Sequence, residues 1–209
     1  MKKLLISLLI MLFPACLQAK DFSTTGHPKS RGLNMNLEYP NSWGFQEGKR
    51  PNTLGVFKEE NQESTKEKEW SYANCALTIK SATQLTSLYG HKLTKDDWKD
   101  ILESFNEEDM ASIAFAELDG QGSLVQYKQT NFDRYPGIII ETKGNLERAG
   151  TKLSMHGNMY VIGVEEYMVF LICASSAFSQ SLADERFEKK DKVTFGLIAN
   201  SIIFPDQYK

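Results

Sequence analysis

The side chains best suited to acid–base or metal chemistry in this 209-residue sequence are its three histidines, His27, His91 and His156. His27 lies in a polar N-terminal stretch, His91 follows a glycine in a loop, and His156 lies in a strand-like run. This spacing does not put two histidines on one element as metal ligands, so the sequence signals neither a metal nor a cofactor. A hydrolase that uses His156 or His91 as a general base is one alternative. Solvated or packed histidines are the simpler interpretation.

Short catalytic motifs are absent from the full sequence. It contains no G-x-S-x-G, H-E-x-x-H, P-loop, G-x-G-x-x-G, C-x-x-C or S-x-x-K pattern. The local signatures of hydrolase nucleophiles, zinc proteases, nucleotide binding and thiol redox centres are therefore missing. This absence favours a protein that is not an enzyme, without deciding the question.

A candidate recognition surface lies in the loop at residues 47–52, which reads EGKRPN. Lys49 and Arg50 are adjacent cations between a glycine and a proline, in a chain whose acidic residues outnumber its basic ones. Two such cations can bind a carboxylate or phosphate group, so we take them as the candidate binding residues. The alternative is a solvated connection between two strands.

Two cysteines, Cys75 and Cys173, lie within strand-like runs, and the apolar alternation around Cys75 directs its side chain inward. In an oxidising compartment, such a pair is a candidate disulfide. Two separate buried thiols are the alternative. In the chain-entropy model, an unstrained link across a loop of this length contributes up to about 4–5 kcal/mol.

The N-terminus is typical of an export signal. Lys2 and Lys3 precede ten uncharged residues, 4–13, about half the length of a membrane-spanning helix. We predict a signal peptide over residues 1–19, a mature chain without a membrane span, and a periplasmic or secreted location. Cys16 lies in a loose match to a bacterial lipoprotein box, so a lipid anchor at Cys16 is the alternative to complete release.

Composition narrows the class of partner. Without Lys2 and Lys3, 22 basic residues face 27 acidic residues, a formal net charge of −5. Such a chain is not built to neutralise phosphates over a large surface, which argues against nucleic-acid binding. Its hydrophobic content of 41% is ordinary for a globular protein. A protein or a small molecule, of unknown identity, is the expected partner.

Hydrophobic periodicity predicts the elements of the domain. A flexible lead-in at residues 20–32 precedes segments with the period-two alternation of half-buried strands. Thr94 and Asp97 have capping-box spacing at the start of an amphipathic helix. The segment at residues 110–118 fits helix and strand equally. The expected strands cover residues 34–39, 43–46, 53–58, 70–81, 124–130, 138–143, 153–164 and 167–175, the helices 85–89, 94–105 and 185–201, the turn 134–137 and the loop 144–150.

This order of elements, with the sequence Tyr39-Pro40-Asn41-Ser42-Trp43 after the first strand, resembles the PsbP-like family. The closing segment at residues 193–202 is similar to the terminal helix of that family. The resemblance covers about residues 33–204, and the charged insert at residues 59–69 and the segment 110–118 depart from it. It implies one domain over residues 33–209, an α+β fold in which an antiparallel β-sheet is flanked by helices, an α/β/α sandwich.

The resemblance also implies a function, because members of that family are mostly accessory, assembly or binding proteins. We therefore expect an exported, non-enzymatic binding or accessory protein of the bacterial envelope. An exported hydrolase with an unrecognised site and a Cys16-anchored lipoprotein remain the alternatives. Trp43 is expected to have a structural role, because a tryptophan after a strand-ending proline can fold back over the edge of the core.

Overall fold

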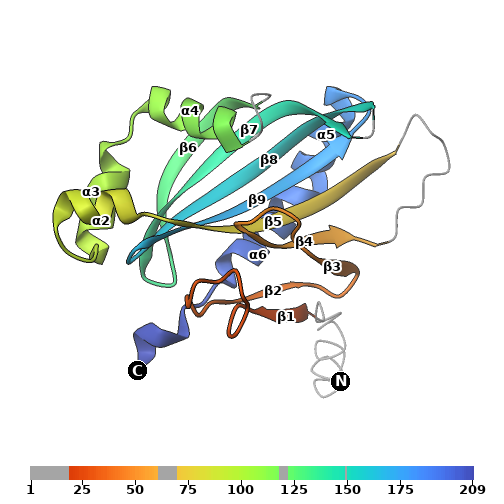
Figure 1. Ribbon diagram of the computed structural model, residues 1–209. Coiled ribbons are helices and arrows are strands. Elements are labelled where there is room, and N and C mark those ends of the chain that lie inside the picture. The colour runs from red at the N-terminus through yellow and green to blue at the C-terminus, as the bar shows by residue number, and fades with distance from the viewer. Residues whose placement is uncertain (1–18, 61–69, 118–121, 149) are drawn as a thin grey trace, which may run out of the picture.

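The computed structural model describes residues 19–60, 70–117, 122–148 and 150–209. Seven strands form one antiparallel sheet in the order β3-β4-β5-β9-β8-β7-β6, and β1 and β2 form a second, two-stranded sheet (Figure 1). Helices pack on both faces of the large sheet, so the predicted α+β class is confirmed. The expected signal peptide, apart from Ala19, lies outside the described residues, and so does Cys16.

Nine strands and seven helical segments make up the described part of the chain. The strands are β1 (Ala19–Ser23), β2 (Asn36–Pro40), β3 (Trp43–Glu47), β4 (Thr53–Glu59), β5 (Ser71–Ser81), β6 (Gly122–Phe132), β7 (Tyr135–Arg148), β8 (Thr151–Val164) and β9 (Tyr167–Ala177). The helical segments are α2 (Thr83–Tyr89), α3 (Lys95–Ser104), α4 (Glu107–Glu117), α5 (Gln180–Arg186), the π-helical turn η2 (Phe187–Asp191), α6 (Lys192–Asn200) and the 3-10 turn η3 (Pro205–Tyr208).

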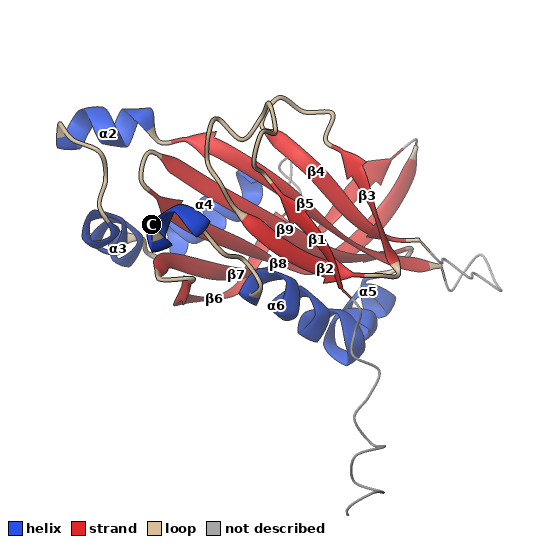
Figure 2. Ribbon diagram, turned by 90° about the horizontal axis from the view of Figure 1, so that it is seen from below, coloured by secondary structure: helices blue, strands red, loops and turns tan. Residues whose placement is uncertain are grey.

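One face of the large sheet packs against α5, η2, α6 and the small sheet, which lie together in the view from below (Figure 2). The alternation predicted for β5 is present, since Cys75, Leu77 and Ile79 are all buried in this core. Trp43 is buried in the same core, edge-on to Phe195 of α6. Its placement is that of a packing residue.

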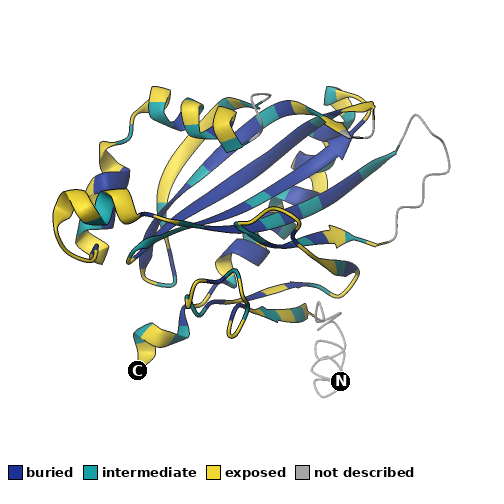
Figure 3. Ribbon diagram, viewed as in Figure 1, coloured by how far each residue is buried: buried dark blue, intermediate teal, exposed yellow. Residues whose placement is uncertain are grey.

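The other face of the sheet packs against α2, α3 and α4, and the outward sides of these helices are exposed (Figure 3). The predicted capping box of α3 is present: the Thr94 hydroxyl accepts a hydrogen bond from the Asp97 backbone N–H, and the Asp97 carboxylate accepts one from the Thr94 N–H. Trp98 and Leu102 then enter the second core against Ile138 and Met159. Two apolar cores on opposite faces make an α/β sandwich.

The lead-in expected at residues 20–32 differs from the structure. Its first residues belong to β1, which pairs antiparallel with β2. The rest of the segment is fixed by buried hydroxyls: Thr24 accepts a hydrogen bond from the Met35 N–H at 2.8 Å, and Thr24 and Ser30 are both buried. The polar composition that suggested flexibility instead satisfies the backbone of a folded-back loop.

The later boundaries also differ in part. The turn between β6 and β7 is Asp133-Arg134, both with positive φ, and β7 starts at Tyr135 and runs to Arg148 through the expected turn and loop. The segment at residues 110–118 belongs to the helix α4. The expected terminal helix starts earlier, where the Ser179 hydroxyl caps α5, and a π-turn interrupts it.

Candidate functional site

The predicted recognition loop forms one wall of a groove on the α3–α4 face of the sheet. The helices α3 and α4 pack over β6, β7 and β8, and the groove opens over β4, β5 and β9, with a volume of about 1410 Å³. Lys49 and Arg50 line it opposite Ala116 and Glu117 of α4. The orange β3–β4 loop and the green α4 mark these two sides in Figure 1. The structure therefore places the candidate binding residues at a concave surface.

The floor of the groove is built from short side chains of neighbouring strands. Asn74 of β5 lies opposite Ala174 of β9, and Ala76 lies opposite Ile172. Alanine side chains extend only a short distance from the sheet, so the surface over β5 and β9 is hollowed at these positions. The amide of Asn74 and the hydroxyl of Thr78 add hydrogen-bonding groups to this mostly apolar floor.

Basic residues outnumber acidic residues around the groove. Among the described residues, Lys49, Lys58 and Lys152 are exposed there without an ion pair, whereas Lys80 contacts Glu117. The full set of charged lining residues is Lys49, Arg50, Lys58, Lys80 and Lys152 with Glu47, Glu117 and Glu147. The groove is thus a basic surface on an acidic chain, and it suits an anionic ligand.

The segment expected to be a flexible lead-in positions the recognition loop. The Lys29 ammonium donates hydrogen bonds to the carbonyl oxygens of Arg50 and Thr53, both at 3.3 Å, and it also contacts that of Gly48. The Arg31 guanidinium donates a hydrogen bond to the Asn52 side chain at 2.9 Å. These contacts hold the backbone of the loop, in which Lys49 and Arg50 are exposed residues.

A second site surrounds His156, one of the two histidines considered as a general base, on the opposite face of the sheet. His156 is 3% exposed, and its Nε2 lies 3.0 Å from Oε1 of Glu141, itself buried on β7. Its Nδ1 lies 2.9 Å from Oδ1 of Asp184, an ion-pair distance without hydrogen-bond alignment. The ring stacks on Phe187 at a centroid distance of 3.9 Å. Sheet and helix thus enclose the imidazole between two carboxylates.

Two lysines balance these carboxylates. Lys143 lies 2.8 Å from Asp184, and Lys192 lies 3.2 Å from both Glu141 and Glu188. Burial raises the pKa of Glu141, but hydrogen bonds from Gln126, His156 and Lys192 outweigh it and hold the pKa below its ordinary value. Glu141 is therefore an ionised carboxylate inside the protein, a costly arrangement unless several donors surround it.

A third group of charges lies next to the His156 site. Asp191, which is 1% exposed, accepts hydrogen bonds from the Arg186 guanidinium at 2.6 Å and from the Ser175 hydroxyl at 2.7 Å. Arg186 also contacts Glu59, which is bound at 2.8 Å by Lys190. These contacts tie η2 to the sheet.

The hydrolase alternative needs a histidine that is free to act on a nucleophile. Both nitrogens of His156 face carboxylates, and the nearby Ser175 hydroxyl donates to Asp191 instead. His91 is exposed, and its Nε2 lies 3.0 Å from Asp97, so it joins the capping box of α3. His27 lies 3.2 Å from Glu47. Within the described residues, none of the three histidines forms the nucleophile–base pair that covalent catalysis uses.

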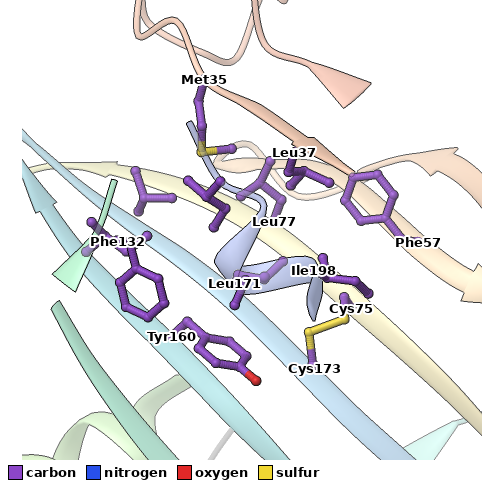
Figure 4. Close-up of a cluster of buried hydrophobic side chains, with 14 of the residues drawn as sticks. Met35, Leu37, Phe57, Cys75, Leu77, Phe132, Tyr160, Leu171, Cys173 and Ile198 are labelled. Carbon is purple, nitrogen blue, oxygen red and sulfur yellow. A yellow bond between two sulfur atoms is a disulfide. The ribbon is translucent and has the colours of Figure 1, made fainter. Parts of the chain in front are cut away.

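The two cysteines of the described chain form a disulfide. Cys75 and Cys173 lie opposite each other in the β5–β9 register, and their sulfur atoms are bonded at 2.05 Å (Figure 4). The bridge lies in the first core, close to Leu77 and Ile198, and both residues are buried. It therefore links the two strands at the centre of the sheet and takes no part in the groove.

The residues that sequence reasoning missed had weak signals. Glu141 follows three isoleucines in a strand predicted to be buried on both faces, and a charge at such a position needs a partner. Asp184, Glu188 and Lys192 recur at intervals of four, which marks one side of a helix. Only the folded structure brings these two segments together.

No family model and no curated protein matches this sequence. Among solved structures, the chain is similar to LpqN, described as involved in cell envelope biogenesis of Mycobacterium tuberculosis, with 12% identity, a TM-score of 0.44, and coverage of 89% of this chain and 91% of that one. It is also similar to the Saccharomyces cerevisiae Ran-binding protein Mog1p, with 8% identity, a TM-score of 0.48, and coverage of 92% and 98%. Likenesses this distant, both with a TM-score under 0.5, decide nothing about family or activity.

The described residues include no helix with the length and apolar character needed to cross a membrane.

Proposed function

We propose that this chain is an exported, non-enzymatic binding or accessory protein of the bacterial envelope, built on a PsbP-like fold. The observation that carries the proposal is the basic groove, where the exposed cations Lys49, Lys58 and Lys152 surround an apolar floor. A rigid sheet supplies the floor, and the hydrogen bonds of Lys29 hold the wall, so the surface is formed before a partner arrives. Preformed sites of this kind bind with a small ordering cost.

The occupant that best fits the groove is an extended, acidic segment of another polypeptide. The groove is larger than the roughly 300–1,000 Å³ typical of small-molecule pockets, and it is open along the sheet. The lining cations match carboxylates, the amides of Asn52, Asn74 and Asn145 match a peptide backbone, and the floor around Ile172 matches apolar side chains.

Export is the second part of the proposal. A positively charged start and ten uncharged residues at the N-terminus support it, and the Cys75–Cys173 disulfide suits an oxidising compartment. Mass spectrometry of the mature protein should find Lys20 at the N-terminus. An acylated Cys16 at the N-terminus would show that the mature chain is anchored to the membrane by lipid and is not released. A full-length chain in the cytosol would overturn export altogether.

The binding proposal is tested by photo-crosslinking in the native envelope. A photoreactive residue at position 56, on the groove floor, should capture a polypeptide, and mass spectrometry should map the adduct to a segment rich in Asp and Glu. The double variant Lys49→Ala, Arg50→Ala should reduce this adduct at least tenfold. The matched control Lys99→Ala, Lys189→Ala removes two exposed cations outside the groove and should leave it unchanged.

Other outcomes count against the proposal. An adduct of the same yield in the Lys49→Ala, Arg50→Ala variant would remove the loop from the binding site. Capture of a small molecule, or of a segment without acidic residues, would reject the acidic polypeptide as the occupant.

A further inference from the structure

Three metal-ligating side chains meet on the face of the sheet that α5, η2 and α6 cover, opposite the groove. They are Glu141 of β7, His156 of β8 and Glu188 of η2. One ligand atom from each lies within 4.8 Å of the other two. Glu141 and His156 are buried and belong to adjacent strands, whereas the Glu188 side chain is 54% exposed. Two ligands are thus fixed by the sheet and the third comes from the solvent side.

The distance between the two buried ligands is close to that of a metal site. In a tetrahedral zinc site with metal–ligand bonds of about 2.0–2.2 Å, two ligand atoms lie roughly 3.3 Å apart. Nε2 of His156 and Oε1 of Glu141 are 3.0 Å apart, so a small outward shift makes room for an ion. Glu188 reaches the same point through its flexible, half-exposed side chain.

The surroundings of these ligands also have the form of a metal site. A metal-bound histidine usually directs its second ring nitrogen to a carboxylate, which orients the ring. Here Nδ1 of His156 faces Asp184 at 2.9 Å and lacks an aligned hydrogen bond. The Gln126 amide donates a hydrogen bond to Oε2 of Glu141 at 2.9 Å, which orients the second ligand.

A cation of the protein itself already lies between the carboxylates. The Lys192 ammonium is 3.2 Å from Oε2 of Glu141 and 3.2 Å from Oε1 of Glu188, and 39% of its side chain is exposed. A divalent ion interacts with two carboxylates more strongly than an ammonium does, and a flexible lysine can turn out to solvent. The π-turn places Glu188 in this position, and such turns are frequent at functional sites.

We propose that Glu141, His156 and Glu188 form a binding site for a zinc ion, and that Lys192 leaves the site when zinc enters. One imidazole and two carboxylates are ligands that zinc takes, and the imidazole disfavours magnesium and calcium. Three protein ligands leave a fourth position for water. Bound zinc would join η2 to β7 and β8 and fix the α5–α6 segment on the sheet.

The test is calorimetric titration of the purified, chelator-treated mature chain with zinc alone. Wild type should bind one zinc ion. Glu188→Gln should weaken zinc binding at least tenfold, because it removes a ligand. Since the Glu188 side chain is half-exposed, this substitution should not unfold the protein, and a loss of binding would report on the site itself. The matched control Glu185→Gln, one turn earlier and also exposed, should bind as wild type does.

Lys192→Ala distinguishes this site from adventitious binding, since it should tighten zinc binding several-fold. Lys189→Ala removes the same charge from a more exposed neighbour, which pairs with Glu185 outside the proposed site, and is its control. Failure of wild type to bind zinc would overturn the proposal. Equal affinities of wild type and Glu188→Gln would overturn it, as would a Lys192→Ala variant that binds no more tightly than Lys189→Ala.

Discussion

The indole of Trp98 lies against the backbone of Gly163, so that any Cβ added at this glycine would collide with the ring. The indole N–H donates a hydrogen bond to the Glu165 carbonyl oxygen at 2.7 Å. Trp98 is fully buried, and this pair of contacts joins α3 to the β8–β9 hairpin. The φ of Gly163 is one that other residues also adopt, so its backbone conformation does not require glycine. The Trp98 ring does, because it occupies the space of a side chain.

Gly163→Ala should destabilise the protein because the indole has no space in which to move. We expect a loss of about 1–3 kcal/mol in the free energy of unfolding, the range for overpacked cores, measured by urea denaturation. Gly196→Ala is the matched control: nothing lies near its Cβ position in α6, and alanine is the better helix former by up to about 1 kcal/mol. Equal stabilities for the two variants would contradict this account of Trp98.

Arg186→Ala should destabilise the protein more than other lysine or arginine substitutions on the same helices. Arg186 bonds Asp191, which is 1% exposed, so its removal leaves a buried carboxylate without its cation. Breaking a buried pair in this way costs about 3–5 kcal/mol. Lys189→Ala, whose partner Glu185 is half-exposed, should change stability by no more than about 0.5 kcal/mol. Comparable losses in the two variants would show that burial does not set the cost.

Reduction of the Cys75–Cys173 disulfide should lower the free energy of unfolding. The bridge spans 98 residues of chain, and closure of a loop this long is worth up to about 4–5 kcal/mol in the chain-entropy model. Urea denaturation with and without dithiothreitol measures the difference. The double variant Cys75→Ala, Cys173→Ala should be insensitive to dithiothreitol, and a wild-type protein equally insensitive would argue that the bond adds nothing to stability.

Local patterns predicted most of the fold because each face of a half-buried strand repeats every two residues. The alternation around Cys75 was readable in this way, and the capping box of Thr94 and the apolar run of β9 are local signals of other kinds. The π-turn and the folded-back segment before Leu33 were not, because they depend on partners far away in the chain, such as the contact of Lys29 with the loop at Arg50.

The candidate sites were readable only in part for the same reason. Two adjacent cations in a loop were visible in the sequence, but the floor of their groove comes from β5 and β9, which lie far apart in the chain. The neighbours of His156 come from β7 and from α5, and its pairing with Glu141 depends on strand register. A one-residue shift in that register would have placed the imidazole on the other face.

Acid should weaken the start of α3 in a defined pH range. Hydrogen bonds from the Thr94 hydroxyl and backbone N–H, then the contact with His91, lower the pKa of Asp97 from 3.8 to about 2. A carboxylate with a lowered pKa stabilises the folded state fully above its unfolded pKa, and the effect is lost as the pH falls through the folded pKa. The stabilisation from Asp97 should therefore be complete at pH 5 and disappear between pH 3.8 and about 2.

Asp97→Asn isolates this effect, because the amide keeps the shape of the side chain and does not titrate. Urea denaturation at pH 5, 3 and 2 should show wild type more stable than Asp97→Asn at pH 5, with the difference shrinking steadily toward pH 2. Asp96→Asn, in the same first turn but outside the capping box, is the control for general charge at the helix N-terminus. A wild-type advantage that stays constant from pH 5 to pH 2 would mean that the Asp97 charge is not what holds the cap.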